Sequence, residues 1–180
     1  DGVTSAGARG ISQDTAGVPD IAELPSRGFE EFGAALATGD VDGDGRDDLV
    51  VGVPGEDTGS GAGAVHVLRG SATGIATSGS QLLTARSLGG GWSAGHGPGF
   101  GSAVATADLD SDGRADLAIG DPTGAGTETG PPVGTVLTAR AGADGGFDGD
   151  GAQLWHIGRA GIPGSAASGD AFGARLAAGD

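Results

Sequence analysis

Short apolar runs recur along the chain and are separated by glycine-rich polar segments. Leu49-Val50-Val51-Gly52-Val53 and Leu117-Ala118-Ile119-Gly120 are continuous apolar runs that end at glycine and proline. Runs this short predict strands buried on both faces. A run of small residues precedes each of them, and two further runs follow each. The further strands are predicted at 33–38, 64–69 and 81–86, and again at 101–106, 134–138 and 153–157.

The same order of strands and turns repeats. Phe32-Gly33 recurs as Phe100-Gly101 and as Phe172-Gly173, and a shift of 72 residues places Gly2-Val3 on Gly74-Ile75. A fixed period of this size indicates a repeat architecture. We therefore read the chain as about two and a half repeats within one domain, residues 1–180. The units are approximately 1–72, 73–144 and 145–180, with the last one truncated.

Four short strands per repeat, joined by tight turns, are typical of a β-propeller blade. The small residues of the first strand fit this interpretation, because innermost strands crowd around the propeller axis. A blade cannot bury both faces alone and needs a neighbour on each side. The predicted fold is all-β: a partial β-propeller of four-stranded antiparallel blades.

An acidic loop lies between the first and second strands of each unit. Asp40, Asp42, Asp44 and Asp48 stand at positions 1, 3, 5 and 9 of a nine-residue loop with Gly45 at position 6. Carboxylates packed this closely repel one another unless a cation lies among them, and oxygen ligands select a hard cation such as calcium. The second loop repeats the spacing with Asp108, Asp110, Asp112, Gly113 and Asp116.

Two other interpretations of these loops are possible. An EF-hand needs a glutamate at position 12 and flanking helices, whereas position 12 here is Val51 or Ile119, inside a predicted strand. Asp-Gly turns that bind nothing are the second alternative. Asp180 stands where a third loop would begin, and it could serve as a ligand only if further chain followed it.

The composition and net charge exclude several classes of binding partner. The net charge is -15, so nucleic acid and anionic membranes, which are polyanions, are poor partners. No apolar run approaches the roughly 20 residues that span a bilayer, so no membrane insertion is expected. The chain has no cysteine, which excludes disulfides and disfavours zinc, and 41 glycines predict many tight turns.

Phe32-Gly33 with Gly52-Val53-Pro54, and Phe100-Gly101 with Gly120-Asp121-Pro122, resemble the FG-GAP repeats of integrin α-subunit propellers. The motif alanine is replaced, by Val53 in one unit and by Asp121 in the next. The resemblance implies calcium in both acidic loops. It also implies a seven-bladed ring, whose remaining blades would come from chain outside these residues. The implied ligands are the aspartate side chains and two backbone carbonyls: Asp40, Asp42, Asp44, Arg46, Asp48, Asp108, Asp110, Asp112, Arg114 and Asp116.

The resemblance implies a calcium-stabilised extracellular module, with structural calcium, that binds a protein or glycan ligand in adhesion. The alternative is a non-catalytic propeller portion of a larger secreted hydrolase, such as a phospholipase-like enzyme. Calcium modules of modest affinity suit the outside of a cell, so we expect secretion. Abundant Ala, Gly, Asp and Arg without Lys, Asn or Cys favours a bacterial source.

Gly91-Trp92-Ser93-Ala94-Gly95 matches the G-x-S-x-G nucleophile elbow. That motif needs a strand before the serine and a helix after it, and the flanking glycines predict neither. We therefore interpret Ser93 as part of an ordinary blade loop, and we expect no enzymatic activity within these residues.

The remaining candidates favour structural roles. His66 and His156 fall within predicted strands and His96 within a loop, and none of them is expected to be catalytic. Trp92 and Trp155 could stack on sugars, but Trp155 is expected to be a core residue of its strand. The acidic segment 144–151 lacks the ligand spacing of the two loops, so solvated turns are predicted there.

Overall fold

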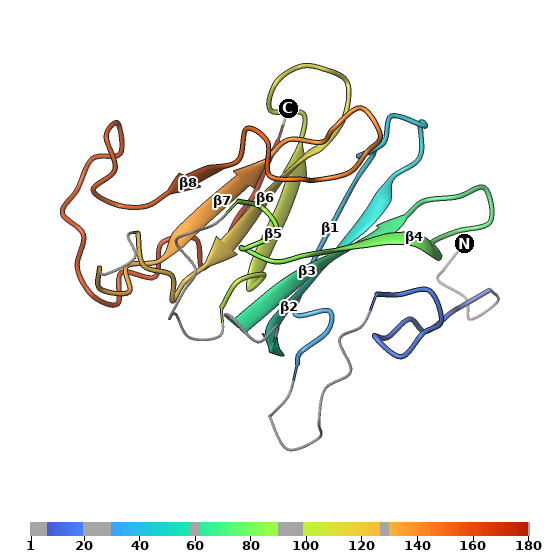
Figure 1. Ribbon diagram of the computed structural model, residues 1–180, viewed down its shortest axis with the longest axis horizontal. Coiled ribbons are helices and arrows are strands. Elements are labelled where there is room, and N and C mark those ends of the chain that lie inside the picture. The colour runs from blue at the N-terminus through green and yellow to red at the C-terminus, as the bar shows by residue number, and fades with distance from the viewer. Residues whose placement is uncertain (1–6, 20–29, 58–61, 90–98, 127–129, 180) are drawn as a thin grey trace, which may run out of the picture.

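Two antiparallel sheets of four strands each form the framework of the protein (Figure 1). The computed structural model describes residues 7–19, 30–57, 62–89, 99–126 and 130–179. The first sheet has the order β1 (Ala35–Gly39), β2 (Asp48–Asp57), β3 (Ala62–Arg69) and β4 (Ala76–Leu83). The second has the order β5 (Ala103–Ala107), β6 (Asp116–Asp121), β7 (Thr135–Ala139) and β8 (Gln153–Trp155).

These sheets confirm the predicted all-β class and the four-stranded antiparallel units. The two sheets do not close into a ring. Within the described residues there is no helix, and hence none long and apolar enough to cross a membrane. The second sheet runs from Ala103 to Trp155, so the connection that contains residue 144 lies inside it.

Several strand bounds differ from the prediction; β4, for example, begins at Ala76 rather than at residue 81. β2 continues through Pro54 to Asp57, with a register irregularity after Val53 that accommodates the proline. β4 ends at Leu83, where Thr84 and Ser87 exchange hydrogen bonds in a turn. The prediction that His156 lies in a strand was wrong, because β8 ends at Trp155. The His156 carbonyl instead accepts a turn hydrogen bond from the Arg159 N–H.

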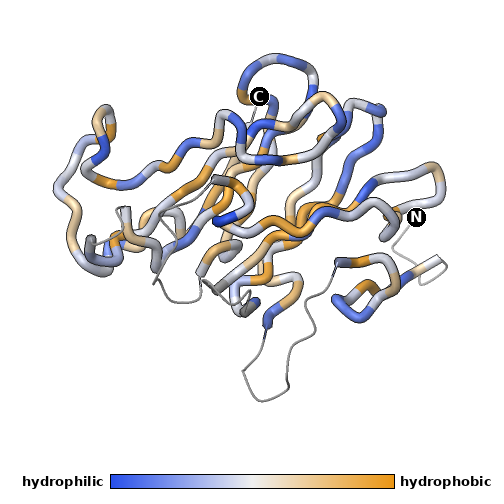
Figure 2. The backbone as a smooth tube through the Cα atoms, in the orientation of Figure 1, coloured by the Kyte–Doolittle hydropathy of each residue, from blue (hydrophilic) through white to orange (hydrophobic). Residues whose placement is uncertain are grey.

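The main core lies between the two sheets (Figure 2). Strands β1 and β5 pack against each other, and each sheet presents one face to the other. The first sheet contributes Val50, Val65 and Val67, all fully buried, because alternate residues of a strand point to the same face. The second sheet contributes Leu117 and Ile119. Each sheet thus covers one face of the other.

The Phe-Gly motifs fix how each unit meets the one before it. Gly52 of β2 lies under the Gly101 backbone, and a Cβ at Gly52 would stand 2.1 Å from the Gly101 carbonyl oxygen. The third copy repeats this contact, since a Cβ at Gly120 would stand 2.0 Å from the Gly173 carbonyl oxygen. Both positions therefore require glycine for close backbone approach.

A second core cluster covers the outer face of the first sheet. Val18 and Ile11, from the N-terminal segment 7–19, pack against Val51 and Leu68. Leu36 of β1 lies on this outer face and is 61% exposed. Val104 stands at the same register position of β5, on the face toward the first sheet, and is buried. Neighbouring sheets therefore decide which apolar residues are covered.

The acidic segment 144–151 is not made only of solvated turns, so that prediction was wrong. Phe147 is 1% exposed and belongs to the main core. Its backbone is held by Gln81 of β4, whose amide nitrogen donates to the Phe147 carbonyl (2.7 Å) and whose amide oxygen accepts from the Phe147 N–H (3.0 Å). The phenyl ring is buried between sheets although its neighbours in sequence are polar.

Candidate metal centres

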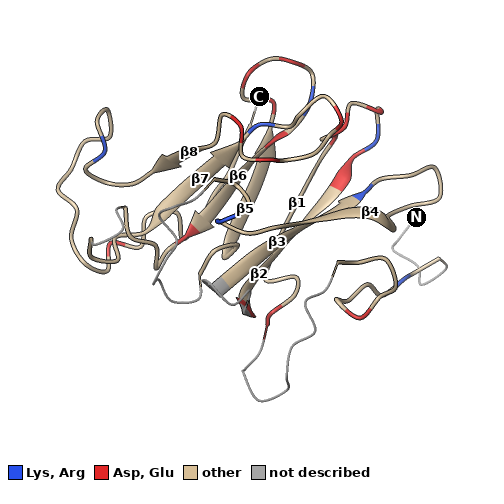
Figure 3. Ribbon diagram, viewed as in Figure 1, with Lys and Arg blue, Asp and Glu red and all other residues tan. Residues whose placement is uncertain are grey.

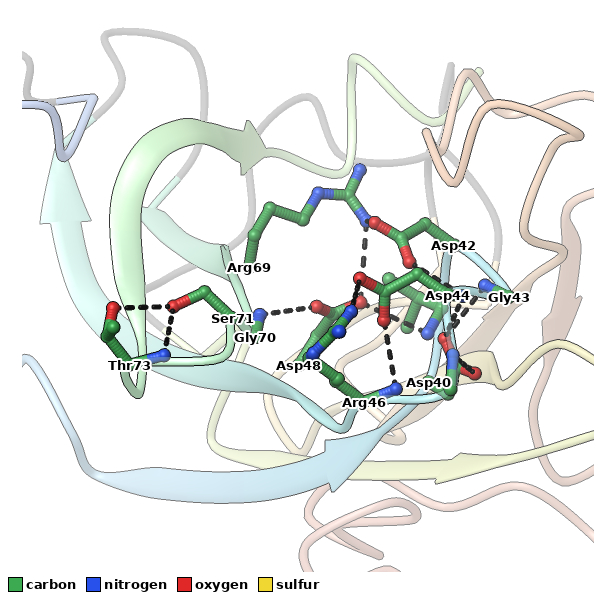
Figure 4. A network of polar contacts seen from close by, with 12 residues as sticks. Asp40, Asp42, Gly43, Asp44, Arg46, Asp48, Arg69, Gly70, Ser71 and Thr73 are labelled. Atoms are coloured by element: carbon green, nitrogen blue, oxygen red, sulfur yellow. Dashed lines mark hydrogen bonds and ion pairs between the residues drawn. The ribbon is translucent and has the colours of Figure 1, made fainter.

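The first acidic loop joins β1 to β2 and is organised by Asp40. One of its carboxylate oxygens accepts from the N–H groups of Gly43 (2.7 Å) and Asp44 (3.1 Å), and the other accepts from Gly45 N–H (2.8 Å). The two glycines have positive φ, 75° and 84°. These conformations turn the backbone inward, so that the loop wraps around one carboxylate (Figure 4).

Asp48 closes the other end of this loop from the first residue of β2. It is 1% exposed, and its two oxygens accept from different backbone donors, Gly70 N–H (2.7 Å) and Val41 N–H (3.1 Å). The Arg69 guanidinium approaches Asp48 (3.4 Å) and Asp42 (3.5 Å). A cationic group therefore already lies beside these two carboxylates (Figure 4).

The folded loop brings together Asp40, Asp42 and Asp48, each of which offers a carboxylate oxygen within 4.8 Å of the others. Asp44 does not belong to this triad. Its carboxylate accepts from the Arg46 backbone N–H (2.9 Å) and pairs with the Arg46 side chain (2.8 Å). Oxygen donors alone favour a hard cation over zinc, so the triad could hold a metal ion of that class.

The second loop joins β5 to β6 and has the same plan. Asp108 accepts from the N–H groups of Asp112 (3.1 Å) and Gly113 (2.9 Å). Asp116 is 1% exposed and accepts from Leu109 N–H (3.0 Å) and Ala141 N–H (2.9 Å). The two loops therefore share their backbone scaffold and the buried carboxylate at position 9.

The ligand sets of the two loops differ. The second triad is Asp108, Asp110 and Asp112, again with carboxylate oxygens within 4.8 Å of one another, and it does not include Asp116. Arg140 lies 3.6 Å from Asp110, and Arg114 pairs with Asp112. Position 9 thus belongs to the first triad and position 5 to the second. The complete sets of five residues in each loop, with the carbonyls of Arg46 and Arg114, stay a prediction.

Burial raises the pKa of Asp48 and of Asp116 above the ordinary 3.8, and neighbouring aspartates act in the same direction. The backbone N–H groups bound to each carboxylate act against this rise. Because the pKa of each group is higher in the folded chain than in the unfolded chain, the protonated carboxyl stabilises the fold at pH values below the ordinary pKa. This contribution is lost as the pH rises through the raised value. At neutral pH a bound cation would offset that loss.

The two loops lie side by side at the same end of the sheets, where Figure 3 shows acidic residues gathered. Ala115 N–H donates to the Asp40 carbonyl (2.7 Å), and the Thr106 hydroxyl donates to the Thr38 carbonyl (2.6 Å). Position 12 of each loop, Val51 or Ile119, lies inside a strand, which excludes the EF-hand. The candidate centres are therefore strand-to-strand loops of adjacent sheets.

Comparison with known protein families finds matches to two segments of the chain. The family model of the FG-GAP repeat matches residues 32–68 and residues 100–136. Each match begins at a Phe-Gly pair, includes an acidic loop and ends within β3 or β7. These two segments therefore match the FG-GAP repeat, which forms non-catalytic modules of propeller type and is typically extracellular. No curated protein matches the chain.

The other candidate residues divide into two groups. Trp92, Ser93, His96 and Asp180 lie outside the described residues. His66 lies in strand β3, as predicted. It is buried there, and its ring meets Phe32 edge to face at 5.5 Å. Trp155 is only partly buried, and the Arg159 guanidinium lies 4.3 Å from its ring centre.

Sequence reasoning missed Arg69 and Gln81, which hold the first loop and the Phe147 turn in place. Arg69 donates to the Gly145 carbonyl (2.8 Å) as well as pairing with the loop. A signal for these residues was present, because each sheet has a glutamine in its fourth strand and an arginine at, or directly after, the end of its third. Arg140 and Gln153 are the counterparts in the second sheet.

Proposed function

We propose that the chain is a calcium-stabilised propeller module in which one calcium ion binds each acidic loop and acts structurally. The observation that carries this proposal is the recurrence of a carboxylate triad at the same strand-to-strand loop of both FG-GAP repeats. The donor set supports calcium, because both triads consist of carboxylates alone. A modest affinity, about 10⁻⁴–10⁻³ M, would suit a module that works outside the cell.

In the proposed complex the first ion is held by Asp40, Asp42 and Asp48, and the second by Asp108, Asp110 and Asp112. The ion supplies positive charge that offsets the repulsion among the carboxylates of each loop. The chain itself supplies the shape of the loops, through the backbone N–H groups bound to Asp40 and Asp108. The Ala115 N–H of the second loop donates a hydrogen bond to the Asp40 carbonyl of the first. An ion that orders one loop would therefore also help to order the other.

Thermal unfolding with and without calcium tests this proposal. At a calcium concentration about a hundredfold above Kd, each site adds about 2.7 kcal/mol of stability. For a chain of this size that corresponds to a rise in Tm of roughly 5–10 °C per site. EGTA should reverse the rise, and magnesium at equal concentration should give a smaller one, because it requires stricter octahedral geometry.

The matched control is the double variant Asp42→Asn/Asp110→Asn, which removes one exposed or half-buried carboxylate from each triad. Its Tm should be the same in calcium and in EGTA. A wild-type Tm that does not respond to calcium would contradict the structural role. A double variant that still responds as strongly as wild type would place the calcium elsewhere.

We further propose that the module binds a protein or glycan ligand in an extracellular setting. FG-GAP repeats support this proposal, because they form non-catalytic propeller-type modules that are typically extracellular. A glycan array and a panel of extracellular matrix proteins, each probed in calcium and in EGTA, would test it. Calcium-dependent binding to one ligand class is the expected result, and uniform background binding across both panels would contradict it.

A further inference from the structure

Arg69, the last residue of β3, extends its guanidinium into the first acidic loop (Figure 4). Its Nη1 atom lies 3.4 Å from an Asp48 carboxylate oxygen and 3.5 Å from an Asp42 carboxylate oxygen. Both carboxylates belong to the triad of the first loop. One nitrogen of the arginine therefore brings positive charge to two of the three carboxylates that would hold a metal ion.

The second sheet fixes the position of this guanidinium. The Arg69 Nη2 atom donates to the Gly145 carbonyl (2.8 Å). A Cβ at Gly145 would meet Asp42 Cβ and would stand 2.9 Å from Arg69 Nη1, so the turn that contains Gly145 closes directly over the ion pair. The Arg69 side chain is 18% exposed, and salt therefore screens its charge less than that of a surface arginine.

The arginines of the second loop are arranged differently. Arg114 pairs with Asp112, and Arg140 lies 3.6 Å from Asp110 with its side chain 54% exposed. Within the described part of the chain, neither of these arginines contacts two carboxylates of its triad. A cation shared between two triad carboxylates is therefore a feature of the first loop.

We propose that Arg69 is an internal cation of the first loop and competes with calcium for Asp42 and Asp48. This inference rests on the proposed function, because it concerns the calcium affinity of the same site. In EGTA, the guanidinium offsets the repulsion between the two carboxylates. In calcium, the same positive charge lowers the affinity of the triad below what its three carboxylates alone would give. Because Gly145 fixes Arg69, the packing of the second sheet on the first contributes to this affinity.

Arg69→Met removes the charge and keeps most of the aliphatic stem. In EGTA the variant should have a lower Tm than wild type, because the two carboxylates lose their cation and the Gly145 carbonyl loses its donor. Its first loop should nevertheless bind calcium about tenfold or more tightly, since even in water a unit positive charge a few ångströms from a divalent ion costs that much affinity. A purely structural arginine would give the lower Tm without the gain in affinity.

Isothermal titration calorimetry of the whole protein at physiological ionic strength measures this affinity. Asp110→Asn is the parent for every variant, because it removes the second proposed site and leaves the first loop to be titrated alone. Arg9→Met is the matched control: Arg9 also donates to a backbone carbonyl, that of Ile75 (3.2 Å), but among the described residues it contacts neither acidic loop. It should leave the affinity within about twofold, because salt screens exposed charges. Arg69→Lys keeps the charge and should bind calcium more weakly than Arg69→Met.

Competition by Arg69 is contradicted if Arg69→Met binds calcium no more tightly than its parent, or if Arg9→Met or Arg69→Lys tightens binding as much. Each of these results leaves the proposed function standing, because calcium still binds to the first loop. Binding that is detectable in Arg69→Met and not in the parent would support the competition. If neither protein binds calcium, the proposed function fails at this loop, and the competition fails with it.

Discussion

Replacing Asp48 by asparagine separates the scaffold of the first loop from its proposed metal ligands. Asp48 is 1% exposed, and its two oxygens accept from two different N–H groups, those of Gly70 and Val41. Asparagine has one acceptor oxygen, so its NH₂ group must face one of these donors. Leaving a buried donor unsatisfied costs about 1–3 kcal/mol. Asp48→Asn should therefore lower the free energy of unfolding even when calcium is absent.

The matched substitution is Asp42→Asn in the same triad. Asp42 accepts one backbone hydrogen bond, from Asp44 N–H (3.2 Å), and its ion pair with Arg69 is partly exposed. In EGTA, Asp42→Asn should therefore lower the free energy of unfolding by about 1 kcal/mol or less. Relief from burying the Asp48 charge acts in the opposite direction, so the Asp48→Asn value should fall toward the lower end of its range.

Urea denaturation in EGTA at pH 7, followed by tryptophan fluorescence, measures both variants. The expected order of stability is wild type, then Asp42→Asn, then Asp48→Asn. In calcium, both variants should lose the additional stability of the first site. The reasoning is refuted if Asp48→Asn is as stable as wild type in EGTA, or if Asp42→Asn loses as much stability as Asp48→Asn.

Two further predictions concern the contact between the sheets. Gly52→Ala should destabilise the protein by more than about 2 kcal/mol in urea denaturation, because its Cβ would meet the Gly101 carbonyl, whereas Gly10→Ala, with no atom near its Cβ, should be neutral. An equal effect of both would contradict the role of close approach. Phe147→Ala should cost about 3–5 kcal/mol in the same assay, and a loss below 1 kcal/mol would show that the ring is not part of the core.

The repeated patterns of the chain predicted most of the fold, because they are local. The apolar runs around Val50 and Ile119 need two buried faces in any arrangement, and the glycines of the acidic loops specify tight turns. The carboxylates of Asp40 and Asp108 stand at the start of each loop, where local N–H groups can reach them. These features depend on residues within one hairpin.

The features that the sequence did not reveal depend on contacts between distant segments. Phe147 lies among aspartates and glycines in the sequence, and its burial depends on distant residues such as Gln81, which is 66 residues away. The membership of the triads also depends on such contacts, since Arg69 reaches Asp48 from another strand. The end of β8 at Trp155 depends on a turn that Arg159 completes.

Direct titration with calcium tests the central claim. Isothermal titration calorimetry on metal-free protein should show two calcium ions bound per chain. Asp42→Asn should reduce this number to one, Asp110→Asn should do the same, and the double variant should bind none. No binding by the wild-type protein, or two ions bound by the double variant, would contradict the assignment of the two acidic loops as calcium sites.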